Sequence, residues 1–425
     1  MEGLISGRVE GSLKKLLEIR NFRNLILTQL VSNLGDGVYR IALIWLMKVL
    51  TGDAFLISVL LAAETLPLIL FGLFAGVLVD KGNKKRIMMI THLIRALLLG
   101  VLILLLGLGL LKPYMLIIIA VLLTCLTAFH KPAITVTIRT LVPDNLMIGA
   151  QSLSQIIQTI INLAAPALAA LLIVFGLQIA FLFNVAAYLT GCIFIILIHH
   201  PKLENSEIDE LTWKKVLLDL KEGVQAITRH PFLRNSMLYF TLINFVTAPE
   251  TVLLPLIVSH VTELAGLEIG YCLGILLGSI SVNYLTKFSP IVYICFGIGL
   301  FSFGIGVFAF NIPFVFQVLC VFINGIGSAF VNIKMSTMIT LSVPQDVLGR
   351  ASSLISVIVL CAVPVSTFLA GIISDYIPIL MIFGIMGLLG FLIMICMFLN
   401  PHLKGSDSRV LALTSEESGK MTRDL

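Results

Sequence analysis

Charged side chains are scarce in this sequence of 425 residues. Asp, Glu, Lys and Arg together make up 12% of the chain, whereas hydrophobic residues make up 58%. A soluble domain carries about twice this charged fraction. The chain therefore has too little polar surface to face water on all sides. This excludes an ordinary soluble enzyme, a nucleic-acid-binding module and a disordered chain.

Several chemical motifs are also missing. The seven cysteines all lie inside apolar runs and none forms a CxxC pair. We therefore expect them to be buried small hydrophobes, with no disulfide framework, metal site or cofactor. No GxxxxGK[ST] loop is present, so ATP is not the direct energy source. A polytopic membrane enzyme would need HExxH or clustered acids in a polar loop, and no outer loop is long enough. We expect no catalytic residues.

Twelve continuous apolar segments are present instead. An α-helix of about 20 apolar residues crosses the hydrocarbon core of a bilayer. Helices satisfy their backbone groups internally, as lipid requires. The segments are 25–49, 55–79, 87–111, 114–138, 150–175, 179–198, 238–258, 269–285, 291–310, 314–341, 348–374 and 379–399. The sequence thus predicts an all-α membrane protein with twelve transmembrane helices.

One long polar stretch, 199–230, divides these segments into two groups of six. Within it, apolar residues recur at helical spacing and predict an amphipathic interfacial helix; they are Trp213, Leu217, Leu220, Val224 and Ile227. Leu13, Leu16 and Leu17 predict a short surface helix before the first span. The expected organisation is a cytoplasmic segment (1–24), a six-helix bundle (25–198), a linker (199–235), a second six-helix bundle (236–399) and a cytoplasmic tail (400–425).

An internal repeat supports two bundles of the same orientation. Phe22-Arg23-Asn24 precedes the first span, and Phe232-Leu233-Arg234-Asn235 precedes the seventh. Farther along, Thr140-Leu141-Val142-Pro143-Asp144 is similar to Thr340-Leu341-Ser342-Val343-Pro344-Gln345-Asp346. Parallel repeats of this kind occur in transporters whose substrate site lies between the halves.

The distribution of lysine and arginine predicts the orientation in the membrane. If both termini are cytoplasmic, the outer loops hold only Lys48 and Lys112, and all the other lysines and arginines outside the spans lie on the cytoplasmic side. This is a strong positive-inside signal. It also accounts for the net charge of +5 without a nucleic-acid partner.

Four charged residues inside spans are the principal site candidates: Asp36, Arg40, Glu64 and Glu250. A charge in a span is costly and normally faces a cavity or a partner. Asp36 and Arg40 are four residues apart on one helical face, and Arg40 and Glu64 fall at the same expected depth. These residues form either a proton or substrate site near the midplane or a structural ion pair between helices.

Other intramembrane polar residues are weaker candidates. Arg95, Lys131 and Lys334 are charged, and the two lysines are able to extend toward the inner surface. His92 and His130 look like lone histidines on apolar helices. We expect them to be satisfied core residues.

The loop after the second span carries a recognisable motif, Gly76-Val77-Leu78-Val79-Asp80-Lys81-Gly82-Asn83-Lys84-Lys85-Arg86. It resembles the inner-loop motif of the major facilitator superfamily. With Ser32-Asn33-Leu34-Gly35-Asp36, Leu66-Pro67, Arg95-Ala96 and the Val343-Pro344…Gly349-Arg350 loop, the chain resembles the macrolide-efflux and enterobactin-exporter branch. His92 departs from it, because an acid often stands there and would pair with the arginine three residues later.

The resemblance implies the major facilitator fold and a monomeric secondary transporter of the cell membrane. It implies a proton-motive-force-driven exporter of small amphiphilic compounds that works by alternating access. Gly76, Asp80, Lys84, Lys85 and Arg86 would then form a conformational switch, with Asp80 contacting the start of the eleventh span in one state. Lys84, Lys85 and Arg86 alternatively serve topology alone. A lipid or lysolipid flippase on the same fold remains the alternative function.

Overall fold

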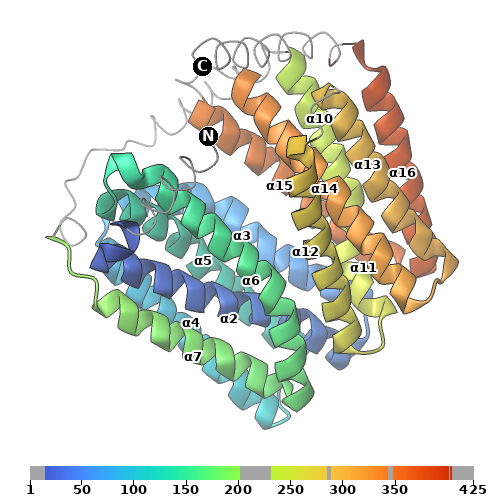
Figure 1. Cartoon of the computed structure of the whole chain (residues 1–425). Coiled ribbons are helices and arrows are strands. Elements are labelled where there is room, and N and C mark those ends of the chain that lie inside the picture. The colour runs from blue at the N-terminus through green and yellow to red at the C-terminus, as the bar shows by residue number, and fades with distance from the viewer. Residues whose placement is uncertain (1–14, 202–230, 285–288, 343–347, 402, 404–425) are drawn as a thin grey trace, which may run out of the picture. The chain divides into compact units, whose positions relative to one another are not determined.

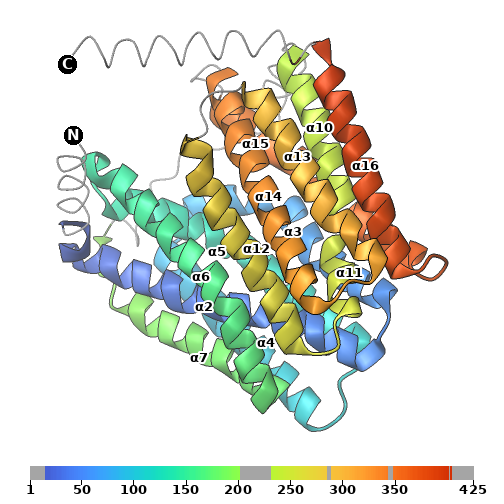
Figure 2. The same cartoon turned by 45° about the vertical axis from the view of Figure 1, so that its right-hand side comes forward.

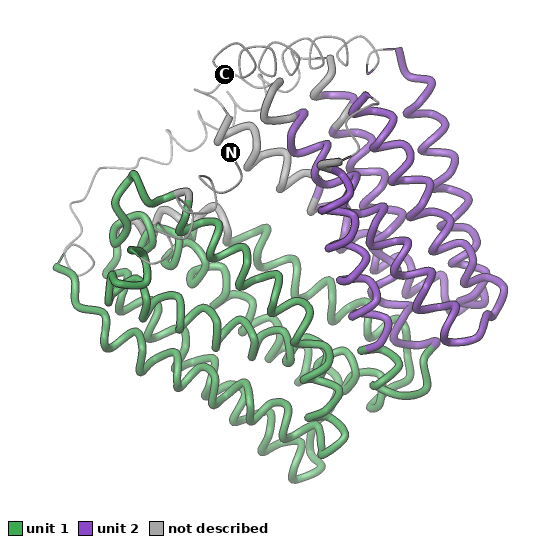
Figure 3. Tube along the Cα trace, viewed as in Figure 1, with its two compact units in different colours: residues 1–210, 258–265 green, residues 211–257, 266–425 purple. Residues whose placement is uncertain are grey.

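The computed structural model describes residues 15–201, 231–284, 289–342, 348–401 and 403 (Figure 1). All regular structure in these residues is helical. The chain forms two compact units, coloured separately in Figure 3. Unit 1 comprises Met1–Glu210 and Val258–Ala265, and unit 2 comprises Leu211–Ile257 and Gly266–Leu425.

The helices follow the apolar segments of the sequence. The first six elements are α2 (Arg20–Thr51), α3 (Ala54–Lys81), α4 (Lys84–Gly107), α5 (Pro113–Leu141), α6 (Met147–Phe175) and α7 (Leu177–Ile196), with a short 3₁₀ turn η1 (Asp144–Leu146). Then follow α10 (Pro231–Thr247), α11 (Glu250–Ile257), α12 (Val261–Tyr284), α13 (Pro290–Gly306), η2 (Val307–Phe310), α14 (Phe314–Ser342), α15 (Leu348–Ile373) and α16 (Ile379–Leu399).

The predicted all-α membrane fold is confirmed. Each of the twelve expected segments overlaps a helix. Among the described residues, ten helical stretches are long and apolar enough to span a membrane. The two others are α2, which has 32 residues but carries Asp36 and Arg40, and α15, whose apolar part is Cys361–Ile373.

Local sequence signals set the helix ends. The Asp53 carboxylate accepts a hydrogen bond from the Phe55 backbone N–H at 2.7 Å and caps α3. The Asn83 side chain caps α4 in the same way, through the Arg86 N–H at 2.8 Å. Such caps satisfy backbone donors that a helix cannot satisfy itself. Gly52 ends α2 with φ of 64°, a left-handed conformation that glycine adopts without steric cost.

The two units repeat one pattern of helix packing. In unit 1, α2 packs against α6 and α7, and α4 packs against α5 and α7; Figures 1 and 2 both show α2 beside α7. In unit 2, α10 packs against α15 and α16, and α13 packs against α14 and α16. Each pairing in unit 2 is the counterpart, six spans later, of one in unit 1. This agrees with the internal repeat in the sequence.

A glycine row lets α12 approach α14 closely. Gly266, Gly270, Gly274 and Gly278 are four residues apart on α12 and face α14. A methyl group at Gly278 would lie 2.8 Å from the Ala329 Cβ and 2.9 Å from the Ile326 carbonyl oxygen. Small residues at this spacing are typical of membrane helices whose backbones touch.

Four expectations about local structure need correction. The seventh segment is not continuous, because α10 ends at Thr247 and α11 begins at Glu250; proline at 249 lacks an N–H and disfavours helix at the residue before it. The eighth span begins eight residues earlier than expected, at Val261. In the expected surface helix, Leu16 is fully buried against the core of unit 1, with Phe22 and Ile26, whereas Leu17 is exposed.

The fourth correction concerns the cysteines. Cys192, Cys295 and Cys320 are buried as expected, but Cys361 and Cys396 are exposed. The expected amphipathic helix of the linker lies outside the described residues.

Candidate functional site

Unit 1 holds a group of polar side chains inside its helix bundle, which we call the amino-terminal polar cluster. Its members come from four helices. They are Asp36 and Tyr39 of α2, His92 and Arg95 of α4, His130 of α5 and Tyr188 of α7. All but Asp36 are buried.

An ion pair lies at the centre of this cluster. Arg95 Nη1 is 4.0 Å from Asp36 Oδ2, and the exposed fractions of the two side chains are 2% and 39%. Tyr188 donates a hydrogen bond from its hydroxyl to Asp36 Oδ1. The Arg95 guanidinium also lies 5.5 Å from the centre of the Tyr188 ring, within range of a cation–π attraction. A buried guanidinium is therefore held by one half-buried carboxylate and one aromatic face.

Helical spacing alone did not indicate the partners that the structure shows for Asp36. These partners are Arg95 and Tyr188, from α4 and α7; the sequence placed Arg40 one turn away on the same helical face. Because His92 stands where an acid is usual, the sequence placed an acid–Arg95 pair in doubt. The pair is nevertheless present, since Asp36 of α2 supplies the acid.

Arg40 and Glu64 form a second charged pair next to the cluster. Glu64 of α3 is half-buried and interacts electrostatically with Arg40 and with Asp36. Tyr39 interacts with Glu64, Asp36 and Arg95, so it connects the two pairs. This interaction is consistent with the expected proximity of Arg40 and Glu64, and Glu64 also interacts electrostatically with Asp36.

The two histidines are not lone, satisfied core residues, and this expectation was wrong. Their rings stack with centres 4.4 Å apart and planes 28° apart. The His92 ring is 5.3 Å from the Tyr188 ring. Neither ring nitrogen of His92 has a hydrogen-bond partner among the described residues, and His130 Nε2 has none either. The sequence could not show that α4 and α5 bring these two turns together.

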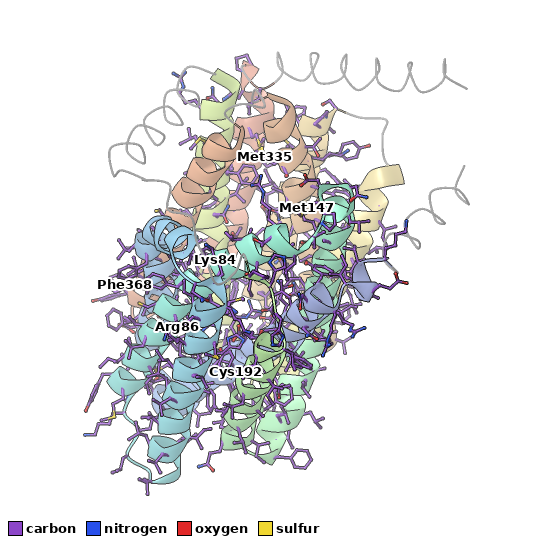
Figure 4. All side chains as sticks on the ribbon, turned by 90° about the vertical axis from the view of Figure 1, so that its left-hand side faces the viewer. Lys84, Arg86, Met147, Cys192, Met335 and Phe368 are labelled. Carbon is purple, nitrogen blue, oxygen red and sulfur yellow. The ribbon has the colours of Figure 1, made fainter. Side chains whose placement is uncertain are left out.

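The inner-loop motif is only partly described. Of Gly76 and Asp80 the structure describes only that both belong to α3. Lys84 is buried with 7% exposed, Arg86 is exposed, and Lys85 Nζ donates to the Ile196 carbonyl oxygen at 3.2 Å. Figure 4 labels Lys84 and Arg86 near the start of α4. The role of these five residues as a switch stays a prediction.

Unit 2 holds a carboxy-terminal polar cluster of Glu250, Glu268, Tyr271, Asn324 and Ser328. Asn324 is fully buried, and its Nδ2 donates to both carboxylate oxygens of Glu250, at 3.0 and 3.2 Å. Glu268 and Tyr271 of α12 interact electrostatically with Glu250, and the Tyr271 hydroxyl donates to Ser328 Oγ at 3.0 Å.

Glu250 stands at the break between α10 and α11. Broken helices at membrane depth are tolerated where they are buried in protein or line a cavity, which is consistent with a functional position. Sequence reasoning missed Glu268, because the expected span began one residue after it.

The remaining basic candidates differ from one another. Lys334 Nζ lies 5.1 Å from the centre of the Tyr293 ring, so a cation–π contact holds it inside unit 2. Lys131 is exposed. No group of three or more His, Cys, Asp or Glu residues suited to a metal ion occurs among the described residues.

Comparison with known proteins places the chain in a family. The model of the Major Facilitator Superfamily matches residues 25–358 and also residues 270–416. The chain belongs to the Major Facilitator Superfamily. Macrolide efflux protein A of Streptococcus pyogenes is 27% identical over 357 residues, which cover 82% of this chain and 87% of that protein. The multidrug efflux pump Tap of Mycolicibacterium fortuitum is 25% identical, over 83% of this chain and 88% of the pump.

Solved structures of membrane transporters share the fold. The nucleoside transporter NupG aligns with a TM-score of 0.66 at 14% identity, covering 90% of this chain and 99% of that one. A bacterial homologue of the iron transporter ferroportin, in its inward-facing state, aligns with a TM-score of 0.69 at 15% identity, covering 91% and 100%. At these identities the likeness concerns the fold alone.

Proposed function

We propose that this protein is a secondary active exporter of small amphiphilic compounds, driven by the proton-motive force and working by alternating access. The observation that carries the proposal is the Asp36–Arg95–Tyr188 arrangement inside unit 1. The efflux function of the related macrolide and multidrug proteins supports the direction of transport and the class of substrate.

The ion pair is suited to proton coupling because one side chain is accessible to solvent and the other is not. Asp36 is 39% exposed, whereas Arg95 is 2% exposed. A proton that binds Asp36 removes the negative charge opposite Arg95. The buried guanidinium is then left without a counter-ion, which is strongly unfavourable in a low-dielectric interior. A rearrangement that gives Arg95 another partner becomes favourable, and loss of the proton restores the pair.

Glu64 and Arg40 extend this scheme. Glu64 interacts with both Arg40 and Asp36, so a change of charge on Asp36 alters the attraction between Glu64 and Arg40. The three residues therefore exchange partners during the cycle, and Tyr39 interacts electrostatically with both Glu64 and Asp36.

The carboxy-terminal polar cluster serves the substrate. Glu250 is held by Asn324 and lies near a second acid, Glu268. Two carboxylates in a largely apolar bundle attract a positively charged amphiphile, whose apolar part packs on the surrounding aliphatic and aromatic side chains. The membrane orientation with both termini cytoplasmic, the monomeric state and the Asp80 switch belong to the same proposal.

Reconstitution in liposomes tests this function. We expect liposomes with an acidic interior to accumulate a macrolide such as erythromycin in exchange for protons, beyond the amount in protein-free liposomes. Protein-free controls are essential because a weak base also enters an acidic lumen by itself. Abolition of the excess by the proton ionophore nigericin supports coupling. Scrambling of a fluorescent lysolipid without drug accumulation would instead favour the flippase function.

A further inference from the structure

The His92–His130 pair has no role in the scheme above. Both rings are buried, with 0% and 5% exposed. Buried polar atoms nearly always have hydrogen-bond partners. Here three of the four ring nitrogens have none among the described residues. Two imidazoles with unused nitrogens, stacked beside an ion pair, require an explanation beyond packing.

The fourth nitrogen indicates where a proton can bind. Thr91 Oγ1 donates to the Met88 carbonyl oxygen at 2.9 Å and lies 2.9 Å from His130 Nδ1. A hydroxyl has one proton. With that proton donated to Met88, His130 Nδ1 is the donor to Thr91 Oγ1. The neutral ring then keeps its proton on Nδ1, and Nε2 is a bare acceptor. His130 therefore has a vacant proton site that faces no described donor.

Charged and titratable groups surround the pair from each helix packed on it. Arg95 of α4 interacts electrostatically with both rings. Asp36 of α2 reaches the pair through Tyr188 of α7, whose ring contacts His92. Cys192 of α7 (Figure 4) directs its thiol to the Met89 carbonyl oxygen at 3.8 Å. Glu64 of α3 reaches the cluster only through Tyr39, and Lys131 of α5 is exposed.

A glycine on α7 leaves the space that the His92 ring fills. A methyl group at Gly191 of α7 would lie 2.8 Å from both Cδ2 and Nε2 of His92. The closest side-chain approach is therefore to the imidazole and not to an aliphatic neighbour. Any larger residue there would displace the ring from its place between Tyr188 and His130.

We propose that the His92–His130 pair is a second proton-binding site, and that its proton and the Arg95 guanidinium occupy this region alternately. The inference rests on the proposed proton coupling and adds a residue pair to it. In the part of the cluster beside the histidines, Asp36 supplies one negative charge, which balances one positive charge. With Arg95 in place, an imidazolium would be a second cation beside the first, and the two repel each other strongly in a low-dielectric interior.

The proton step is balanced within the cluster. When Arg95 leaves, the O–H bond of a protonated Asp36 breaks and an N–H bond forms on an imidazole, with Tyr188 between them. Asp36 regains its negative charge and the pair gains one positive charge. The imidazolium thus replaces Arg95 as the counter-ion of Asp36. Arg95 is then able to move away while the negative charge of Asp36 stays balanced by the imidazolium.

Nuclear magnetic resonance of ¹⁵N-histidine-labelled protein in detergent tests this without any substrate. Imidazole nitrogen shifts distinguish neutral rings from imidazolium, and the variants H92Q and H130Q assign the signals. In the wild type, we expect both rings to stay neutral between about pH 8 and pH 5, the range in which histidine ordinarily gains its proton. In R95Q, we expect the pair to gain one proton in that range. R95K keeps the positive charge and should behave like the wild type.

Two results would overturn the inference. One is an imidazolium signal in the wild-type protein that H92Q or H130Q assigns to this pair. The other is a pair that stays neutral in folded R95Q. Neither result depends on transport, so both are distinguishable from failure of the proposed function.

A transport measurement then relates the site to coupling. H130Q should lower erythromycin accumulation driven by a pH gradient about tenfold while leaving exchange without a gradient within about twofold. The matched control is H260Q, because His260 is exposed and lies outside both polar clusters. An H130Q protein that accumulates drug with the pH profile of the wild type would contradict the assignment.

Discussion

Arg95 of α4 and Asp36 of α2 meet at 4.0 Å inside unit 1, and Tyr188 of α7 touches both. Three helices that are distant in sequence thus converge on one charge pair. Arg95 is almost fully buried and Asp36 is not. Protonation of Asp36 therefore leaves a charge without its counter-ion in the protein interior, where water cannot compensate for it. The first prediction follows directly from this asymmetry.

Removal of the acid should destabilise the protein more than removal of both charges. D36N leaves Arg95 buried without a counter-ion, at a cost of about 1–3 kcal/mol, because Asp36 is partly exposed and the full cost of a buried pair is discounted. The double variant D36N/R95M no longer buries a charge and should be more stable than D36N alone. Thermal unfolding in detergent measures both. A double variant that is less stable than D36N would contradict this prediction.

Substitution at Gly191 should disturb the histidines. A methyl group there overlaps His92, so G191A should lower the unfolding temperature and slow transport. The control is G100A, since a Cβ at Gly100 on α4 meets no atom within 4 Å. Alanine is favoured over glycine in a helix by about 1 kcal/mol, so G100A should be neutral or stabilising. If G191A matches G100A in both measurements, the close packing of α7 on His92 has no consequence.

Neutralisation of Glu250 should affect charged substrates selectively. E250Q preserves the side-chain shape but removes the negative charge held by Asn324. We expect its affinity for a cationic amphiphile such as ethidium to fall about tenfold, equivalent to about 1.4 kcal/mol, with little change for a neutral one. D375N, at an exposed acid after α15, is the control. Parallel losses for cationic and neutral ligands would indicate a structural role.

The inner-loop acid should control the rate of the conformational cycle. Asp80 follows Gly76 in the motif beside the basic group Lys84, Lys85 and Arg86. D80N should leave the protein inserted and folded but slow transport strongly. D53N is a matched control, because Asn caps a helix as well as Asp does and Asp53 caps α3. A D80N protein with normal transport rates would exclude the switch.

The sequence was informative where the physical signal is local. Apolar length gave the helices, and helical depth placed Arg40 near Glu64. It failed where the partner comes from another helix. Spacing placed Arg40 on the same helical face as Asp36, but it could not show that the packing of α4 and α7 brings Arg95 and Tyr188 to this carboxylate.

Two further misses had different causes. His92 and His130 each look isolated along the chain, and only the turn-by-turn register of α4 against α5 makes them a pair. Glu268 was lost because its charge shortened the apparent apolar run, so the expected span began after it.

Substrate-driven proton movement tests the central claim most directly. Liposomes that contain the purified protein and a trapped pH dye, with equal pH on both sides, receive erythromycin outside. If the protein exchanges drug for protons, drug entry should make the lumen more alkaline than in protein-free liposomes. D36N should bind or exchange the drug but move no protons. Drug uptake by the wild type with no change in lumenal pH beyond the protein-free control, or an unchanged proton signal in D36N, would contradict the account.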